Sequence, residues 1–304
     1  MISLIITLLF AAYIGFLAQA TGLCLVRGVS ESMTGRPLRL LAILLAGFWI
    51  YLYLPVLPAE YLSDYLPRYR WHPGFMLGGV LFGLGAALNG ACSISTASRL
   101  SCGDLRMLFT MMGWLAGWLL LEFLDLRFTY QTEASTGSGM TVLNYIALAL
   151  ISLFSILVYW QNKTRWRTWR GIMLVGILAG AMFLLQPVWP PSDFVRDLGL
   201  SILHENAAGL PSLHRIGILL AMLVGMVISA WHYRRFRLIL PDLLSTGRYL
   251  LSGMMMGAGA ALALGGNDYQ LLMAVPALSL AGISALASML LGVFLGIHLL
   301  RRIQ

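Results

Sequence analysis

Long apolar segments recur along the whole chain, and they restrict its fold more than any other feature. Of the 304 residues, 59% are apolar and only 11% are charged, and the mean hydropathy is +0.83. These values lie outside the range of water-soluble domains, and an apolar stretch of roughly 20 residues can cross a bilayer as a helix. The sequence therefore predicts an all-α integral membrane protein.

The apolar stretches predict nine membrane-spanning segments. The first has no basic lead and no cleavage site, so we interpret it as a retained helix rather than a signal peptide. The third and the eighth are short and rich in glycine, and each runs into a polar turn. The approximate ranges are 3–22, 38–57, 73–90, 104–124, 141–160, 171–187, 214–232, 249–265 and 276–300.

The distribution of Lys and Arg predicts the orientation of these segments, because both residues collect in cytoplasmic loops. Nine crossings with the N-terminus outside place 15 of the 20 Lys and Arg residues inside. A topology in which both short segments are re-entrant, entering the membrane and returning to the same side, places at most 12 there. The basic clusters 162–170 and 232–237 contain aromatic residues, which is typical of a lipid interface and not of nucleic-acid binding. We predict a multi-pass protein with a cytoplasmic C-terminus.

Similar sequences in the two halves indicate an internal duplication. "GLGAALNGAC" at 83–92 aligns with "GAGAALALGG" at 257–266 with five identities in ten, and 15–24 aligns more loosely with 176–185. The two glycine-rich segments are five crossings apart, so they run in opposite directions and the repeats are inverted. The predicted single transmembrane domain is 1–304, with repeats at about 1–125 and 165–304 and a linking helix at about 141–160.

Paired glycine-broken helices in inverted repeats predict a transporter site near the middle of the bilayer. Close helix packing is an alternative explanation for the glycines, above all for Gly79, Gly83, Gly253 and Gly257. Packing does not explain why one segment ends in "CSIST" and the other in "GGNDYQ". We therefore expect these turns to line a polar path, with the outer segment 187–212 folded over its mouth.

Three blocks of the sequence resemble the YeeE/YedE family of sulfur transporters, which includes bacterial thiosulfate importers. They are "GFLAQATGLC" at 15–24, the block 78–118 around "GLGAALNGACSISTASR", and "GAGAALALGGNDYQLLMAVPALSL" at 257–280. The resemblance implies a bacterial inner-membrane protein that imports a small sulfur-containing anion, with thiosulfate as the leading candidate. It also implies a small cytosolic sulfur-carrier protein as a partner.

The resemblance further implies which side chains contact the anion. Cys24 and Cys92 match two family cysteines, whereas Gly266 stands where thiosulfate importers have a third. A cysteine restored at Gly266 is expected to improve thiosulfate handling, unless the turn requires a backbone angle that suits only glycine. Thiols and hydroxyls are adaptable donors for an oxyanion. The predicted substrate-binding residues are Cys24, Cys92, Ser93, Ser95, Thr96, Gly266, Asn267 and Asp268.

Structural roles remain open for several of these residues. A membrane cysteine is often only a small apolar side chain, and Asn267 and Asp268 also suit a helix cap. Cys102 matches no family cysteine, so we predict a structural role for it. The transport hypothesis requires Cys24 and Cys92 to be reduced thiols.

The chain offers no other recognisable chemistry. Its three cysteines form no C-x-x-C pair, its five histidines are scattered, and it has no nucleotide-binding motif. We therefore predict no enzyme activity, no cofactor and no metal site. The alternative function is a non-transporting scaffold or accessory subunit for a cytosolic sulfur-carrier protein. A continuous polar path would favour transport, and turns closed by apolar side chains would favour the scaffold.

Overall fold

A computed structural model of the chain describes most of its length. The described residues are 2–56, 66, 68–124, 126, 131, 142–161, 163–186, 189–203 and 211–303. Within these ranges the regular secondary structure is helical, and an isolated β-bridge between Asp104 and Ile239 joins two loops. The predicted all-α class is confirmed.

The helices differ in length according to whether an apolar run is interrupted by a glycine-containing turn. Uninterrupted runs form helices of 18 to 24 residues, such as α7, α8 and α14, whereas α2 and α6 have only nine residues each. The elements are α1 (Ile2–Thr21), α2 (Leu25–Met33), α3 (Leu38–Ala46), the 3₁₀ turns η1 (Gly47–Leu52) and η2 (Leu54–Val56), α5 (Pro73–Asn89), α6 (Ser93–Ser101), α7 (Arg106–Phe123), α8 (Val142–Gln161), α9 (Lys163–Leu185), α10 (Pro191–Leu203), α11 (Leu213–His232), α12 (Leu243–Leu262), α13 (Asn267–Tyr269), the π-helical η4 (Gln270–Ala274) and α14 (Leu280–Ile303).

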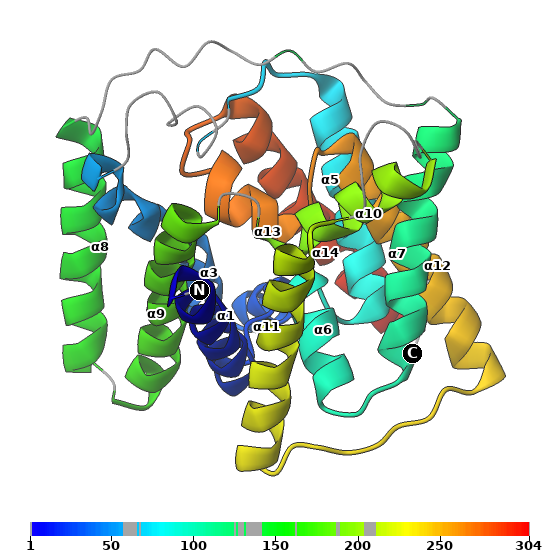
Figure 1. Cartoon of the computed structure of the whole chain (residues 1–304), viewed down its shortest axis with the longest axis horizontal. Coiled ribbons are helices and arrows are strands. Elements are labelled where there is room, and N and C mark those ends of the chain that lie inside the picture. The colour runs from blue at the N-terminus through cyan, green and yellow to red at the C-terminus, as the bar shows by residue number, and fades with distance from the viewer. Residues whose placement is uncertain are drawn as a thin grey trace.

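The same order of elements occurs in both halves of the chain. In the first half, α1 breaks before the short α2, α3 follows, and α5 breaks before α6 and α7. In the second half, α9 is followed by the short α10, α11 comes next, and α12 breaks before α13, η4 and α14. Helix α8 connects the halves and stands at the edge of the molecule, where most of its apolar side chains are exposed (Figure 1).

Helix length and composition identify fewer candidate spans among the described residues than the nine crossings predicted. Among the described residues, seven helices are long and apolar enough to span, or eight if the pair formed by α12 with α13 and η4, bent by 44°, is one span. The predicted segment 104–124 forms α7, whose 18 residues include Arg106 and Glu122, and it is not among the seven. Nine crossings therefore stay a prediction.

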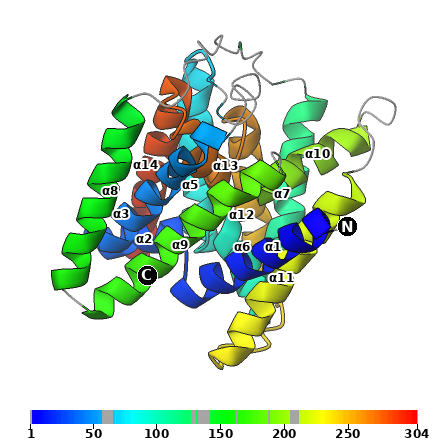
Figure 2. The same ribbon diagram turned by 60° about the vertical axis from the view of Figure 1, so that its left-hand side comes forward.

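Glycines allow the central helices to approach at backbone distance. Helix α5 packs against α12 and α14, and α12 also packs against α7 (Figure 2). A methyl group added at Gly83 would lie 2.2 Å from the carbonyl oxygen of Met289, and one at Gly257 would lie 2.0 Å from that of Trp114. The packing role considered for these glycines is thus confirmed.

Two loops that the sequence assigns to the same side of the membrane are joined in the structure. Leu105 N donates to Ile239 O at 3.0 Å, and Ile239 N donates to Gly103 O at 2.9 Å. Arg237 N also donates to Cys102 O at 2.7 Å. The loops after α6 and α11 therefore lie at the same end of the helix bundle, as the predicted alternation of crossings requires.

The close contact between α7 and α12 predicts opposite effects for two glycines of α12. A methyl group at Gly253 would lie 2.1 Å from Thr110 O, whereas one at Gly247 would meet nothing within 4 Å. We expect Gly253→Ala to lower stability by about 1–3 kcal/mol because the helices must separate. The control Gly247→Ala should be neutral or stabilising by up to about 1 kcal/mol, since alanine favours a helix. Thermal unfolding in detergent measures both, and equal melting temperatures would contradict the packing argument.

Candidate functional site

Three helix breaks share one backbone geometry. Each begins with a residue in the left-handed region: φ is +63° at Gly22, +71° at Gly90 and +57° at Leu264. Two residues later, an extended residue forms the N-cap of the next helix: Cys24 before α2, Cys92 before α6 and Gly266 before α13. The predicted correspondence of Cys92 with Gly266 is therefore matched by their position in the structure.

The first turns of the restarting helices are capped by side chains from other breaks. An N–H group without a partner is costly inside a membrane, where water is absent. Leu25 N of α2 donates to Cys92 Sγ at 3.4 Å. Ser93 N of α6 donates to Asn267 Oδ1 at 3.3 Å. These two hydrogen bonds connect α2, α6 and α13 into one cluster.

The fourth restarting helix, α10, joins the same cluster. Ser192 N, at its first turn, donates to Asp268 Oδ2 at 3.0 Å. Ser192 and Asp268 are both about 1% exposed. The sequence-based prediction treated 187–212 as an outer loop over the mouth, and this is wrong for the start of α10, which packs against α6, α7 and α13. Residues 187–188 and 204–210 of that segment lie outside the described residues.

Ser95 lies between the two buried thiols. Its Oγ lies 3.1 Å from Cys24 Sγ and 3.3 Å from Cys92 Sγ, so its single hydrogen can be donated to either sulfur, and it accepts from Cys92 N at 2.7 Å. Arg27 N donates to Cys24 Sγ at 3.5 Å. All three cysteines are free, including Cys24 and Cys92, for which the transport hypothesis requires reduced thiols. Cys24 and Cys92 also hydrogen-bond to each other, so an anion that accepts from both thiols must replace that bond.

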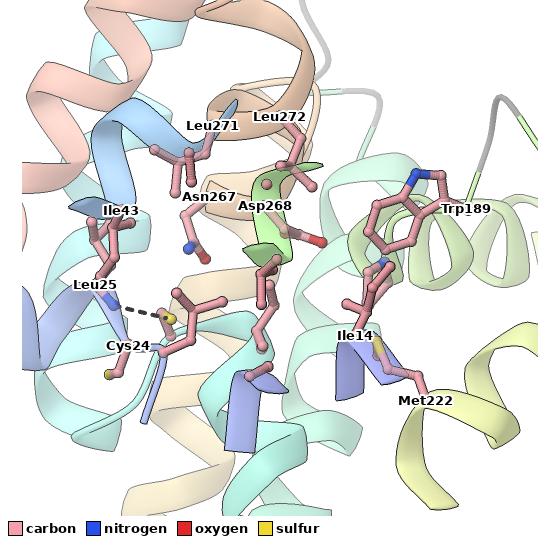
Figure 3. A pocket seen from close by; sticks show the side chains of 18 residues that line it. Ile14, Cys24, Leu25, Ile43, Trp189, Met222, Asn267, Asp268, Leu271 and Leu272 are labelled. Atoms are coloured by element: carbon pink, nitrogen blue, oxygen red, sulfur yellow. Dashed lines mark hydrogen bonds between the residues drawn. The ribbon is translucent and has the colours of Figure 1, made fainter. Parts of the chain in front are cut away.

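A cavity of about 50 Å³ lies among the breaks (Figure 3). It has room for about three to five water molecules, at roughly 10–15 Å³ each, which is the scale of a small anion. Its polar lining consists of Cys24 and Cys92 from the first half and Asn267 and Asp268 from the second. Of the described residues that line it, none is Lys or Arg. Aliphatic and aromatic side chains form most of the remaining wall, including Ile14, Leu25, Ile43, Trp189, Met222 and Leu271.

Asn267 and Asp268 share one hydroxyl partner, Ser93. The Ser93 Oγ lies 2.7 Å from Asn267 Oδ1 and 3.0 Å from Asp268 Oδ1. Asn267 Oδ1 also accepts from Ser93 N, which fixes the orientation of the amide and leaves its Nδ2 group beside the cavity (Figure 3). Both residues serve as caps for neighbouring helices and line the cavity, so the two roles considered from the sequence coexist.

The remaining predicted residues support the cavity rather than line it. Ser93 and Ser95 hold the lining groups, as described above. Thr96 accepts from Asn89 Nδ2 at 2.8 Å and donates to Cys92 O at 2.8 Å, so it stabilises the break between α5 and α6. Cys102 lies at the far end of α6, where Gln19 Nε2 donates to its sulfur at 2.7 Å. The structure therefore brings four of the eight predicted residues to the cavity wall.

Sequence reasoning missed two features of this site. Asn89 is about 1% exposed and bonds to Thr96 and to Thr110 Oγ1 (2.8 Å). A polar residue in a glycine-rich apolar helix is the signal that could have identified it. The start of α10 was missed because its sequence, rich in Pro and polar residues, is typical of a surface loop. Only the contacts with Asp268 reveal that it reaches the cavity.

The structure corrects the expectation for a third cysteine. Gly266 has an ordinary extended backbone (φ −74°, ψ −177°), so its backbone angle suits any residue. The limit is space, because a Cβ atom there would lie 2.7 Å from Asp268 Oδ1 and 3.0 Å from Ser192 Cβ. The ring of Trp114 is 3.2 Å from the same point. The carboxyl group of Asp268 from the second half and the indole ring of Trp114 from the first half therefore lie beside the position of the missing thiol.

This crowding predicts that Gly266→Cys is harmful. The added side chain must displace Asp268, which is held by Ser93 and Ser192, so we expect a loss of about 1–3 kcal/mol in stability. Gly266→Ala should show most of the same loss, because the first added carbon causes the clash. Thermal unfolding of both variants beside Gly247→Ala checks this. Parent-like stability of Gly266→Cys would mean that the turn has room for a third thiol.

Known proteins similar to this chain are sulfur transporters. Residues 20–160 and residues 145–295 each match a family model described as sulphur transport. The chain is also 25% identical over 337 residues to the thiosulfate transporter TsuA of Escherichia coli (strain K12), with 97% of this chain and 94% of that protein covered. Because the family model matches well over half of the sequence, the chain belongs to the YeeE/YedE family of sulfur transport proteins.

Proposed function

We propose that this protein imports thiosulfate, and that the anion passes through the cavity between the helix breaks. The observation that supports this best is the meeting of Cys24 and Cys92, each the N-cap of a restarting helix, at one small buried cavity. The similarity to the thiosulfate transporter TsuA supports thiosulfate as the substrate. Other small sulfur-containing anions have the same chemistry and are the substrates to compare with it.

The proposed binding chemistry uses neutral donors. The thiols of Cys24 and Cys92 and the amide of Asn267 donate to the anion, and the N-termini of α2 and α6 add partial positive charge. A site without a fixed cation binds an anion weakly enough to release it, which a transport path requires. Leu25, Ile43 and Leu271 must move for the anion to pass, because they share the cavity wall.

We also propose that the two halves are inverted repeats, with an external N-terminus and a cytoplasmic C-terminus. Three observations support this: the family model matches twice, the order of elements is the same in both halves, and the pair α5–α14 has its counterpart in α12–α7. The excess of Lys and Arg on one side supports the orientation. Nine crossings follow from this arrangement if α7 and α12 both span.

Import of a dianion needs a source of energy. Each negative charge that enters a cell costs about 2.3 kcal/mol at 100 mV, inside negative, so two charges cost about 4.6 kcal/mol. The sequence contains no nucleotide-binding motif, so a coupled ion gradient or removal of the anion inside must supply this energy. A cytosolic sulfur-carrier protein is our proposed partner for removal. Its proposed docking region includes the groove lined by Arg167, Arg170 and Arg235.

The scaffold hypothesis draws support from the apolar part of the cavity wall. Uptake separates the two functions, because a scaffold carries no anion across a vesicle membrane. Purified protein in vesicles should exchange external labelled thiosulfate for internal thiosulfate. Failure to exchange thiosulfate, sulfite or a selenium oxyanion would favour the scaffold.

The thiol hypothesis predicts a graded effect of three substitutions. Cys92→Ala should reduce thiosulfate uptake by about tenfold or more, since one lost hydrogen bond to a charged group is worth roughly 1.5–3 kcal/mol. Cys24→Ala should reduce it by a similar or smaller factor. The matched control Cys102→Ala should leave uptake close to the parent, because its sulfur bonds to Gln19 and lies away from the cavity. Uptake of labelled thiosulfate, at equal amounts of protein in the membrane, measures all three. Uptake by Cys92→Ala at the parent rate would show that this thiol has only a packing role.

The proposed orientation predicts the location of two reporters. A reporter fused after Gln304 should be active in the cytoplasm, and one inserted after Asn206 should be active outside. The second position follows α10, so the insertion avoids the buried start of that helix. Opposite results at both positions would reverse the orientation of the chain.

A further inference from the structure

Asp268 is a deeply buried acidic group on the cavity wall, and no cation among the described residues pairs with it. The residue is about 1% exposed. Among the ion pairs of the described residues, none includes Asp268, whereas nearby Asp193 is paired with Arg196 at 3.0 Å. An ionised carboxylate without a counter-ion is very unfavourable in such a place, and the usual response is to take up a proton.

The hydrogen bonds around Ser93 give an independent reason for a proton on Asp268. Ser93 Oγ lies within bonding distance of two oxygens, Asn267 Oδ1 at 2.7 Å and Asp268 Oδ1 at 3.0 Å. A hydroxyl has one hydrogen and can donate to only one of them. The side-chain amide of Asn267 cannot be flipped so that its nitrogen donates to Ser93 Oγ, because Ser93 N requires the amide oxygen as its acceptor. The arrangement is complete if Asp268 Oδ1–H donates to Ser93 Oγ, and Ser93 donates to Asn267.

The titratable groups around Asp268 do not supply an alternative proton or counter-charge. Helix α10 brings Asp193, Arg196 and Asp197, and Arg196 is shared by the two aspartates. Helix α6 brings Cys92 at its N-cap, and η4 (Gln270–Ala274) contains no titratable residue. Cys24 of the α2 break shares the cavity, and Tyr269 follows Asp268 on α13. Asp268 therefore faces two thiols and a second acidic residue.

We propose that Asp268 is a proton-binding site and that the protein transports a proton together with its anion. This inference rests on the proposed thiosulfate function and specifies its coupling. The Asp268 carboxylate takes a proton from external water, and the neutral acid then admits the anion, which the ionised form would repel. When the site opens inward, the anion leaves and the O–H bond of Asp268 breaks, releasing the proton to the cytoplasm. No bond to sulfur forms or breaks.

Proton entry with thiosulfate tests this coupling directly. Vesicles containing the purified protein carry an internal pH dye, with the membrane potential clamped by potassium and an ionophore. We expect thiosulfate to acidify the interior of wild-type vesicles, and a one-unit inward pH gradient to accumulate it up to about tenfold per coupled proton. Thiosulfate taken up by the Asp268→Asn variant should not be accompanied by protons. The control Asp242→Asn, at the exposed N-cap of α12, should match wild type.

The outcomes separate this inference from the proposed function. Labelled thiosulfate exchange, measured in the same vesicles without a gradient, reports transport alone. If the wild type exchanges thiosulfate without proton entry, or Asp268→Asn still carries protons, the coupling is overturned and the thiosulfate function stands. If the wild type exchanges no thiosulfate, the proposed function fails and the coupling falls with it.

Infrared spectroscopy tests the proton without any transport measurement. The wild type at neutral pH should show the C=O stretching band of a protonated carboxylic acid that is absent from Asp268→Asn. This measurement tests whether Asp268 is protonated even if the Asp268→Asn variant folds but does not transport thiosulfate. Identical carbonyl bands in the two proteins would show that Asp268 is ionised, and would overturn the proposal.

Discussion

The structure depends on how broken helices satisfy their backbone groups inside a membrane. Each break exposes N–H and C=O groups where no water can reach them, and such groups cost several kcal/mol each if they stay unpaired. Here the breaks cap one another: Leu25 N bonds to Cys92, Ser93 N to Asn267, and Ser192 N to Asp268. Loss of one capping side chain therefore disturbs a neighbouring helix as well as its own.

This mutual capping also determines where polar chemistry can occur. The cavity lies where the capping side chains meet, so Cys24, Cys92, Asn267 and Asp268 on its wall each also form a structural hydrogen bond. The two halves contribute different chemistry to it. The first half supplies the thiols of Cys24 and Cys92, and the second supplies the amide of Asn267 and the carboxyl group of Asp268. Gly266, crowded by Trp114 and Ser192, marks the position where the second half lacks a thiol.

Local sequence was sufficient to predict the features that depend on local geometry. Apolar length predicted the helices, and the glycines at 90 and 265 marked breaks because they take left-handed or otherwise unusual backbone angles. Cys24, Cys92, Asn267 and Asp268 were predicted to bind substrate, and all four line the cavity. Features that depend on long-range packing were not predicted. Nothing in the sequence near Ser192 indicates that it contacts Asp268, 76 positions away.

The central claim is that an anion binds at the thiols of Cys24 and Cys92, and protection from a thiol reagent tests it most directly. The protein carrying Cys102→Ala is treated with a small membrane-permeant alkylating reagent, and labelling of the two remaining cysteines is followed by mass spectrometry. Thiosulfate should slow the labelling of both, whereas chloride at equal ionic strength should not. Equal labelling rates with and without thiosulfate, in protein that exchanges thiosulfate, would contradict the account.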